Sequence, residues 1–430
     1  MIILVTQVDN LTKLKIYKKN SLYADFLFSY PATYLFHKTL PSQKVDTHQL
    51  FWAVRDKKNI LYIHIPFCYH ICDFCNVYKE KVDYSLIESY LQELFREIDD
   101  VSWYIKDITR VYIWGWTPTL LSDEQLNSLL QKIHTSFQLS KDCYIEIDAF
   151  PSTLTDKKLS ILAANNVAQI SIWIQSMEPE VLTNVGRVWQ NFKVVEKMIS
   201  HLQKYNFNLH FDFILGLPGE NIVEMKSNIE YIAQNAHPYS VSINSYDNTI
   251  DTQLYKRYST YFKQKQYKEH LRKNMAEMEE LLESKYSITR KTTFYFSDFW
   301  RKNMNVVALW AGAFWFLNTS GVYRNPLLQE YLDRGYEYKK IIPFVLEDYK
   351  VMFLIHNYYL RDINERYNAM FSTDMYDDFS RQIDILEKKG FVKNFGQSNL
   401  QFCFWTSSIA YFEFINFYSF NILWYYNIYE

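Results

Sequence analysis

The sequence predicts an α/β fold built on a parallel β-sheet, either open or closed into a barrel. From Leu61 onward, short runs rich in β-branched residues alternate with longer amphipathic stretches, which is typical of βαβ units. After about residue 250 the pattern becomes mainly helical. From Glu347 it reads helix, helix and a polar hairpin around 395–398, which predicts a small winged-helix-like C-terminal domain.

Six strands are expected, at 61–65, 111–114, 143–147, 169–174, 208–215 and 239–243. The stretches between them predict helices at 84–99, 122–137, 156–165, 190–205 and 221–235. The second helix opens with Ser122-Asp-Glu-Gln125, a capping-box pattern. The segment Gly216-Leu-Pro-Gly219 predicts a turn at a strand end. Because parallel sheets bind ligands at the carboxyl ends of their strands, we expect the functional residues just after each strand.

Composition and charge exclude several classes of protein. A chain of 430 residues is long enough for two or more domains. Its formal net charge of -2 argues against nucleic acid or an anionic membrane as the main partner. The longest apolar stretch, 414–429, is interrupted by polar residues and is shorter than the ~20 residues of a membrane span. The N-terminus lacks the features of a signal peptide, so we expect a soluble, cytoplasmic protein.

Three of the five cysteines lie directly after the first expected strand. Cys68, Cys72 and Cys75 have C-x3-C-x2-C spacing, and five cysteines are too few for a disulfide framework, so we expect a metal site in a reducing compartment. Three thiolates suit a four-iron cluster with one iron open to a further ligand. Zinc, with His64 or His70 as fourth ligand, and unliganded thiols are the alternatives. We expect both histidines to orient the loop instead.

The segment LYIHIPFCYHICDFC resembles the cluster-binding segment of the radical S-adenosylmethionine (SAM) superfamily, close to oxygen-independent coproporphyrinogen III oxidases and their HemW-like relatives. Further segments resemble this family in the same order: GWTPTLLSDEQL, SIWIQSMEPEVLTNVGR, FDFILGLPGE and, more weakly, LWAGAFWFLN with GVYRN. The resemblance implies a partial (β/α)6 radical SAM barrel. The implied domains are an N-terminal extension (1–59), the core barrel (60–250), a mainly helical region completing the barrel (251–345) and a winged-helix-like C-terminal domain (346–430).

The resemblance also implies the residues of the site. Cys68, Cys72 and Cys75 would hold one 4Fe-4S cluster, and SAM would chelate its open iron. Tyr62 resembles the family tyrosine near the SAM sulfonium and is the candidate for both cofactor binding and catalysis. The other expected SAM contacts are Phe74, Gly115, Thr117, Pro118, Glu146, Gln175, Arg187 and Asp212. Gly115 is expected where the missing Cβ lets the backbone approach SAM.

Ordinary structural roles are the alternatives for several residues. Glu146 could be a solvated strand residue, Gln175 a turn former and Arg187 half of a surface ion pair of little energy. Cys143 and Cys403 are expected to be packing residues. The second helix of the C-terminal domain is acidic in its leading turns, so we expect a packing or lid role there and not DNA binding.

Tryptophan stands where this family has glycine. The turn that resembles GGGTP reads Trp114-Gly115-Trp116-Thr117-Pro118, and Trp173, Trp310 and Trp315 fall at three more family glycines. Glycine is 9 of 430 residues, about 2% where roughly 7% is usual, and tryptophan is 11. Our hypothesis is that UGA codons, translated here as tryptophan, are read as glycine by the organism. A decayed, inactive homologue is the alternative, although decay would scatter changes over many residue types.

The activity implied by the resemblance is that of a radical SAM oxidoreductase. Reductive cleavage of SAM, with an electron from a flavodoxin- or ferredoxin-type donor, would give a 5′-deoxyadenosyl radical that removes hydrogen from a tetrapyrrole. With coproporphyrinogen III as substrate, this leads to oxidative decarboxylation of a propionate. Asn76 and Val77 follow Cys75, so the fourth cysteine of the oxidases is missing. A radical SAM methyltransferase, a HemW-like haem-binding chaperone and a cluster protein without turnover stay open.

Overall fold

The structure is a computed structural model that describes the greater part of the chain between residues 55 and 402. The described residues are 55, 58–75, 79–115, 117–246, 252–282, 289–290, 304–312, 314–317, 321–336, 340–343, 350, 363–388, 392–394 and 400–402. Most of the N-terminal extension expected at 1–59, together with Trp116 and Cys403, therefore lies outside the described residues. Among the helices that are described, none is long and apolar enough to cross a membrane.

All six expected strands are present and neighbouring strands run parallel. In sheet order they are β1 (Asn59–Ile65), β4 (Ile108–Gly115), β5 (Leu139–Ala149), β6 (Gln169–Gln175), β7 (Asn208–Leu215) and β8 (Ser240–Ser245). The chain turns after β7, at Pro218 and Gly219, as the glycines there predict. The α/β prediction is therefore confirmed, and the carboxyl ends of these strands meet along one edge.

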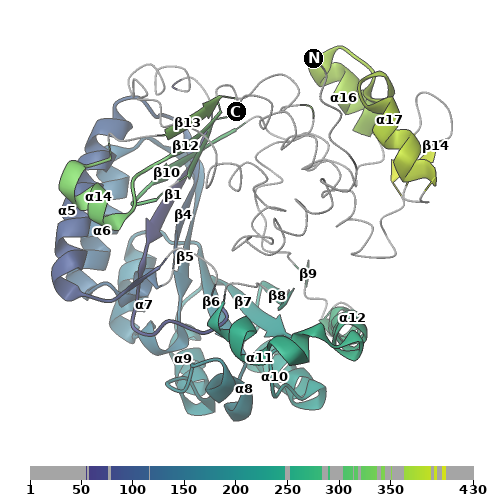
Figure 1. Cartoon of the computed structure of the whole chain (residues 1–430). Helices are drawn as coiled ribbons and strands as arrows, with labels where there is room; N and C mark the ends of the chain where they lie inside the picture. The colour runs from purple at the N-terminus through teal and green to yellow at the C-terminus, as the bar shows by residue number, and fades with distance from the viewer. Residues whose placement is uncertain are drawn as a thin grey trace.

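Helices connect the strands in the predicted order. They are α5 (Tyr84–Ser102), α6 (Asp123–Ser136), α7 (Asp156–Ala164), α9 (Phe192–Leu202) and α10 (Ile222–Ala236). The short α8 (Pro179–Asn184) was not expected, because six residues are too few to show a helical period. In Figure 1, α5, α6 and α7 lie on the outer side of the curved sheet.

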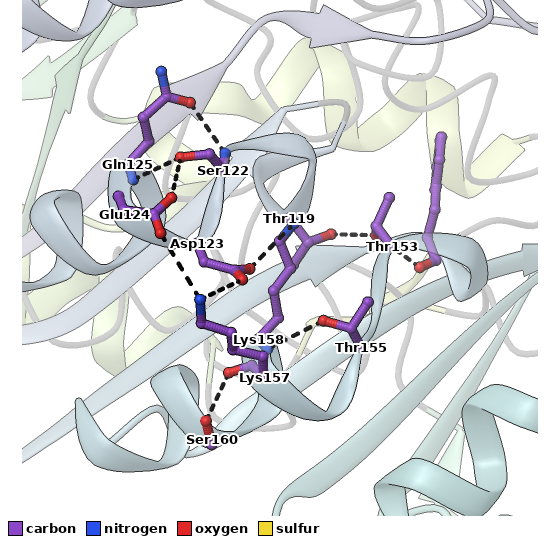
Figure 2. Close-up of polar contacts among 11 residues, drawn as sticks. Thr119, Ser122, Asp123, Glu124, Gln125, Thr153, Thr155, Lys157, Lys158 and Ser160 are labelled. Atoms are coloured by element: carbon purple, nitrogen blue, oxygen red, sulfur yellow. Dashed lines mark hydrogen bonds and ion pairs between the residues drawn. The ribbon is translucent and has the colours of Figure 1, made fainter.

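The capping box predicted for α6 is present. Gln125 N donates to Ser122 Oγ at 3.1 Å, and Ser122 N donates to Gln125 Oε1 at 3.0 Å, as Figure 2 shows. Asp123, in the first turn, also lies 3.2 Å from Lys157 Nζ and 3.8 Å from Lys158 Nζ of α7. These contacts fix the start of the helix that follows the β4 turn.

The region 251–345, expected to be mainly helical, also supplies strands to the sheet. It begins with α11 (Gln253–Lys263) and α12 (Lys265–Glu280), and later contains α14 (Leu328–Arg334). The strands are β9 (Thr289–Arg290), which pairs with β8, β10 (Asn305–Leu309), which runs parallel to β1, and the antiparallel β11 (Phe314–Leu317), β12 (Gly321–Arg324) and β13 (Lys340–Pro343). All of β10 is buried, and periodicity alone cannot distinguish such a short continuous run from a buried helix.

The described residues of the C-terminal part include two helices followed by a hairpin, in the expected order; 347–349 and 351–362 lie outside the described residues. The elements are α16 (Ile363–Phe371), α17 (Met375–Lys388) and the antiparallel pair β14 (Val392–Asn394) and β15 (Leu400–Phe402). Asp377 and Asp378 lie in the first turn of α17. Asp378 accepts hydrogen bonds from Lys350 Nζ and Tyr367 Oη, both at 2.7 Å, so part of this acidic charge is used for packing. The winged-helix-like domain itself stays a prediction.

The two faces of the parallel sheet carry different chemistry. Strand isoleucines such as Ile63, Ile113 and Ile147 belong to the core that the helices cover. Because successive strand side chains point to opposite faces, the residues between them face the concave interior. This interior set is polar and aromatic and comprises Tyr62, His64, Tyr112, Trp114, Glu146, Asp148, Ser171, Trp173, His210 and Asp212.

Candidate functional site

The cysteine loop leaves the carboxyl end of β1 and continues from β2 (Phe67–Cys68). Cys68, Cys72 and Cys75 are buried and free of disulfides. They pack in one apolar cluster that also contains Phe74. A backbone hydrogen bond of 3.1 Å from Cys75 N to Cys72 O turns the loop. The expected cluster ligands and their neighbouring aromatic residue therefore lie together.

This donor set fits an iron–sulfur cluster in kind and spacing, since clusters of this type are held by thiolates on short loops. The Cys68 Sγ donates to His70 O at 2.8 Å and lies 3.9 Å from Thr117 Oγ1, so it is turned toward the backbone. In agreement with this, the described residues contain no three His, Cys, Asp or Glu side chains arranged around a common metal position.

Arg187 is a buried cation behind the loop. Its side chain is 1% exposed, and its Nη2 donates to the Trp173 carbonyl and, at 2.9 Å, to Gln190 Oε1. The guanidinium also lies 4.7 Å from the ring centre of Phe150 and 5.0 Å from that of Trp189. Because the group is buried in this way, the surface ion pair considered as an alternative is contradicted.

The Arg187 charge acts on the cysteines. Burial raises the pKa of the Cys72 thiol, and the neighbouring guanidinium opposes that rise. Burial likewise raises the pKa of Cys68, while the His70 carbonyl, the Thr117 hydroxyl and Arg187 oppose it. A fixed positive charge at this place favours thiolates, which are the metal-binding form of cysteine.

The end of β6 is irregular. The register with β7 shifts between Trp173 and Gln175, and Gln175 has a φ of 64°, which is rare for a residue with a side chain. Gln190 Nε2 holds this bend by donating to the carbonyls of Ile174 and Ser176, each at 2.8 Å. The Gln175 side chain is buried, and its Oε1 has no hydrogen-bond partner among the described residues. An unpaired buried acceptor on a strained residue favours a ligand contact over a simple turn.

Three carboxyl groups line the interior. Glu146, Asp148 and Asp212 are 1%, 2% and 3% exposed. Ser171 Oγ donates to Glu146 Oε1 at 2.7 Å, and His210 Nε2 lies 3.4 Å from Asp212 Oδ2. Burial raises the pKa of Glu146, and burial together with the charges of Glu146 and Asp212 raises that of Asp148 well above its ordinary value. Glu146 is therefore not a solvated strand residue.

Asp148 and Gln190 are interior residues that the sequence analysis missed. Asp148 lies two residues after Glu146, and this spacing places both on one face of a strand, which was a usable signal. For Gln190 no local pattern was available, because its two carbonyl partners precede it by 16 and 14 residues. Asp148 Oδ2 and Glu146 Oε2 lack hydrogen-bond partners in the part of the chain that is described.

Tyr62 and His64, two residues apart on β1, reach the same interior. The Tyr62 hydroxyl and His64 Nδ1 are 2.8 Å apart. Trp114 and Trp310 meet the Tyr62 ring edge to face, with ring centres at 5.9 and 5.8 Å, and Trp310 stacks on His64 at 3.8 Å. Burial raises the pKa of Tyr62 well above its ordinary value, and the Asp148 charge adds to this. Tyr62 is therefore a neutral hydrogen-bonding group.

The turn after β4 packs directly on β1. Gly115 has a φ of 119°, and a Cβ at this position would lie 2.4 Å from the Ile65 carbonyl oxygen, so only glycine fits. Thr117 is fully buried and faces the Cys68 thiol. Pro118 begins the 3₁₀ turn η1 (Pro118–Leu120). The structure thus places Gly115 and Thr117 against the cysteine loop.

The turns after β4 and β5 are joined to each other. The hydroxyls of Thr119, in η1, and Thr153, in η2 (Pro151–Thr153), are 2.6 Å apart, as Figure 2 shows. Thr153 Oγ1 also donates to Phe150 O at 2.9 Å. This buried link fixes the loop that carries Thr117 relative to the strand that carries the interior carboxyl groups. Phe150 also contacts Arg187, so the link continues toward the cysteines.

Comparison with known sequences finds a family match for part of the chain. Residues 62–232 match the profile of the Radical SAM superfamily. The heme chaperone HemW of Lactococcus lactis subsp. lactis is 32% identical over 184 residues, 43% of this chain and 48% of that protein. The oxygen-independent coproporphyrinogen-III oxidase-like protein HemZ of Bacillus subtilis is 31% identical over 211 residues, 46% of this chain and 42% of that protein. The chain spans about half the length of these curated relatives.

Comparison with solved structures finds a protein of the same fold as this chain. The coproporphyrinogen III oxidase HemN of Escherichia coli, described as a radical SAM enzyme, matches with a TM-score of 0.73 and 18% identity. The match covers 91% of this chain and 98% of that one. The resemblance inferred from the cysteine segment and the later motifs is therefore confirmed.

Proposed function

Residues 62–232 are a radical SAM domain related to HemW, HemZ and coproporphyrinogen III oxidase, and we propose that the chain uses it to oxidise a tetrapyrrole. The observation that carries the proposal is the loop after β1, where three buried cysteines lie together and two of them, Cys68 and Cys72, feel the charge of the Arg187 guanidinium. A 4Fe-4S cluster and SAM, when bound, would supply a 5′-deoxyadenosyl radical, with the electron coming from a flavodoxin- or ferredoxin-type donor.

The surrounding side chains suit the binding of SAM. Arg187 offers a buried, fixed cation for a carboxylate. Gln175 Oε1 and Glu146 Oε2 are buried acceptors without partners among the described residues, suited to an ammonium or to ribose hydroxyls. Asp212, on β7 beside the strand that ends at Gln175, is also proposed to accept a hydrogen bond from the ammonium or a ribose hydroxyl. The turn at Gly115 brings backbone close to the loop, as contact with SAM would need.

Tyr62 and the interior of the barrel are proposed to hold the substrate beside SAM. The Tyr62 hydroxyl stays protonated and hydrogen-bonded to His64, so it can orient a group without removing a proton. A buried interior also excludes water from a reactive radical. With coproporphyrinogen III, hydrogen removal from a propionate side chain would lead to oxidative decarboxylation.

A haem-binding chaperone is the second candidate. The heme chaperone HemW of Bacillus subtilis is 33% identical over 187 residues, 42% of this chain, and the match to HemW of Lactococcus lactis is similar. This candidate requires tight haem binding without substrate-dependent cleavage of SAM. The two functions therefore differ in a measurable product.

The test is 5′-deoxyadenosine formation from SAM and dithionite under strict anaerobiosis. The protein is reconstituted with iron and sulfide and carries glycine at 114, 116, 173, 310 and 315. We expect product that increases with coproporphyrinogen III and disappears in Cys72→Ala; Cys143→Ala, in which the half-buried thiol of β5 is removed, is the matched control and should keep activity. Haem binding with no product from a fully loaded cluster would overturn the oxidase proposal in favour of the chaperone.

A further inference from the structure

Tryptophans gather at the carboxyl ends of the strands. Trp114 is the penultimate residue of β4, Trp173 lies near the end of β6 and Trp310 directly follows β10. These ends border the interior into which the cysteine loop and the Gly115 turn lead. In the sheet, β10, β1 and β4 are adjacent (Figure 1), so Trp310 and Trp114 stand on either side of β1.

Two of these indoles close the interior beside Tyr62. Trp114 and Trp310 contact the Tyr62 ring from their two strands, and Trp310 also covers the His64 ring at 3.8 Å. Trp310 is 4% exposed. An aromatic side chain of this size buries roughly 150–250 Å². Trp114 and Trp310 therefore occupy space at the strand ends where the polar interior residues also lie. A ligand that reaches from the cysteine loop to Tyr62 would meet these rings.

Trp114 is also poorly suited to its surroundings. Its Nε1 is buried and has no hydrogen-bond partner among the described residues. Buried tryptophans usually pair this group, and leaving it unpaired costs about 1–3 kcal/mol. Trp114 further lies 5.1 Å from the Tyr112 ring on the same strand face. Position 114 therefore holds a large ring packed against two tyrosine rings, with a buried N–H donor that has no partner among the described residues.

The residue after Trp114 shows what the turn requires. Gly115 cannot carry even a Cβ, because that atom would lie 2.4 Å from the Ile65 carbonyl oxygen. Trp116, the other neighbour, lies outside the described residues. The sequence therefore places the largest side chain on both sides of a position where the smallest is obligatory.

Composition agrees with these local conflicts. The chain has 9 glycines and 11 tryptophans; if all of the tryptophans were glycine, the total of 20 would be about 5% of 430, nearer to the roughly 7% of an average protein than the present value of about 2%. The low glycine content and the high tryptophan content have a single cause if one codon is read in two ways. If the tryptophans were real and filled the barrel interior, the low glycine content would have no explanation.

We infer that positions 114, 116, 173, 310 and 315 are glycine in the protein made by its own cells, and that the barrel interior beside Tyr62 is consequently open to SAM. The identity of these residues does not depend on the proposed function; the openness to SAM rests on it. Glycine at 114 and 310 removes both indoles that contact the Tyr62 ring and the one that covers the His64 ring.

Mass spectrometry of the protein purified from its source cells tests the residue identities. Trypsin gives three informative peptides, since 111–132 holds positions 114 and 116, 159–187 holds position 173, and 303–324 holds positions 310 and 315. We expect each peptide to have the mass calculated with glycine. Synthetic peptides of both versions serve as standards. Tryptophan at any of the five positions overturns the inference, whatever the protein does with SAM.

Equilibrium dialysis with SAM tests the open interior. The cluster-loaded chain with five tryptophans is compared with the chain carrying glycine at the same five positions, after iron analysis has shown equal cluster content. We expect at least about tenfold tighter binding to the glycine form. Trp103→Gly is the matched control, because Trp103 is 80% exposed at the end of α5, and it should change nothing. Equal affinity of the two chains overturns the open interior even if the masses show glycine.

Discussion

The Tyr331 hydroxyl donates a 2.8 Å hydrogen bond to the Glu97 carboxylate, and both side chains are fully buried. Glu97 belongs to α5 and Tyr331 to α14. Asn325 Nδ2 donates to the other Glu97 oxygen at 2.8 Å and to the Trp310 carbonyl at 2.9 Å. Burial, and then the Glu97 charge, raises the pKa of Tyr331 well above its ordinary value. One carboxylate therefore ties the segment after β10 to α5.

Glu97→Ala should lower the free energy of unfolding by about 2–5 kcal/mol, because it leaves the buried Tyr331 and Asn325 donors without their acceptor. The measurement is an anaerobic denaturant titration of the cluster-loaded protein. Lys157→Ala removes a side chain that is 65% exposed and should change the free energy by less than about 0.5 kcal/mol. Equal effects of the two variants would show that the buried hydrogen bonds contribute nothing.

Gly115→Ala should prevent formation of the site. The added Cβ meets the Ile65 carbonyl at 2.4 Å in a backbone conformation that favours glycine, so we expect a loss of about 3 kcal/mol or more in the free energy of unfolding. Gly186→Ala is the matched control. Gly186 also has a positive φ, of 71°, but its Cβ would lie 3.5 Å from Asp73, an ordinary contact, so only about 1 kcal/mol should be lost. Thermal melting distinguishes the two.

Much of the barrel could be predicted from the sequence, because the apolar residues of its strands and helices recur with the periods of those elements. The alternation of isoleucine with polar residues on β1 to β8 follows directly from strand geometry. The cysteine loop was predictable from its spacing. The strand β10 was missed since its buried run has no alternation. The strands β11 to β13 have only four residues each, which is too short for a clear period.

The connections within the site were less predictable than its residues. Arg187 could be named from the motif, but its partner Gln190 and the bend at Gln175 depend on backbone carbonyls that the sequence does not reveal. Likewise, the Thr119–Thr153 link joins turns that are 34 residues apart. Such contacts arise only when the strands assemble, because local sequence carries no information on them.

Arg187→Met should lower the reduction potential of the bound cluster. Reduction adds negative charge, which the buried guanidinium beside Cys72 stabilises, so its loss should shift the potential downward by an amount on the order of tens of millivolts. The potential of Arg187→Lys should lie between those of the unmodified protein and Arg187→Met, because the charge is kept but the contact with Gln190 is altered. Redox titration monitored by electron paramagnetic resonance gives the values. Lys204→Met, which removes an exposed cation in the turn after α9, should leave the potential unchanged.

Two carboxyl groups should make the fold less stable as the pH rises. Burial raises the pKa of Glu178 and of Glu220 to about 7 each, and the Glu178 charge adds to the effect on Glu220. They meet where α8 begins and β7 ends: Glu178 Oε2 accepts from Asn221 N, and Glu220 Oε2 from Gly216 N, both at 2.8 Å. Both groups thus hold their protons longer in the folded than in the unfolded chain.

The sign of the pH effect follows from this difference in bound protons. Below about pH 4.5 the two carboxyls are protonated in both states. Between about 4.5 and 7 the unfolded chain loses its protons first, so the free energy of unfolding falls as the pH rises, and above 7 it stays at the lower value. In the double variant Glu178→Gln/Glu220→Gln, the decrease in the free energy of unfolding between pH 5.5 and 8 should be about 1–2 kcal/mol smaller than in the unmodified protein. Denaturant titrations at both pH values measure it, with Glu196→Gln on the exposed face of α9 as the control for lost charge. If the double variant and the control have the same pH dependence, the two buried carboxyls do not cause it.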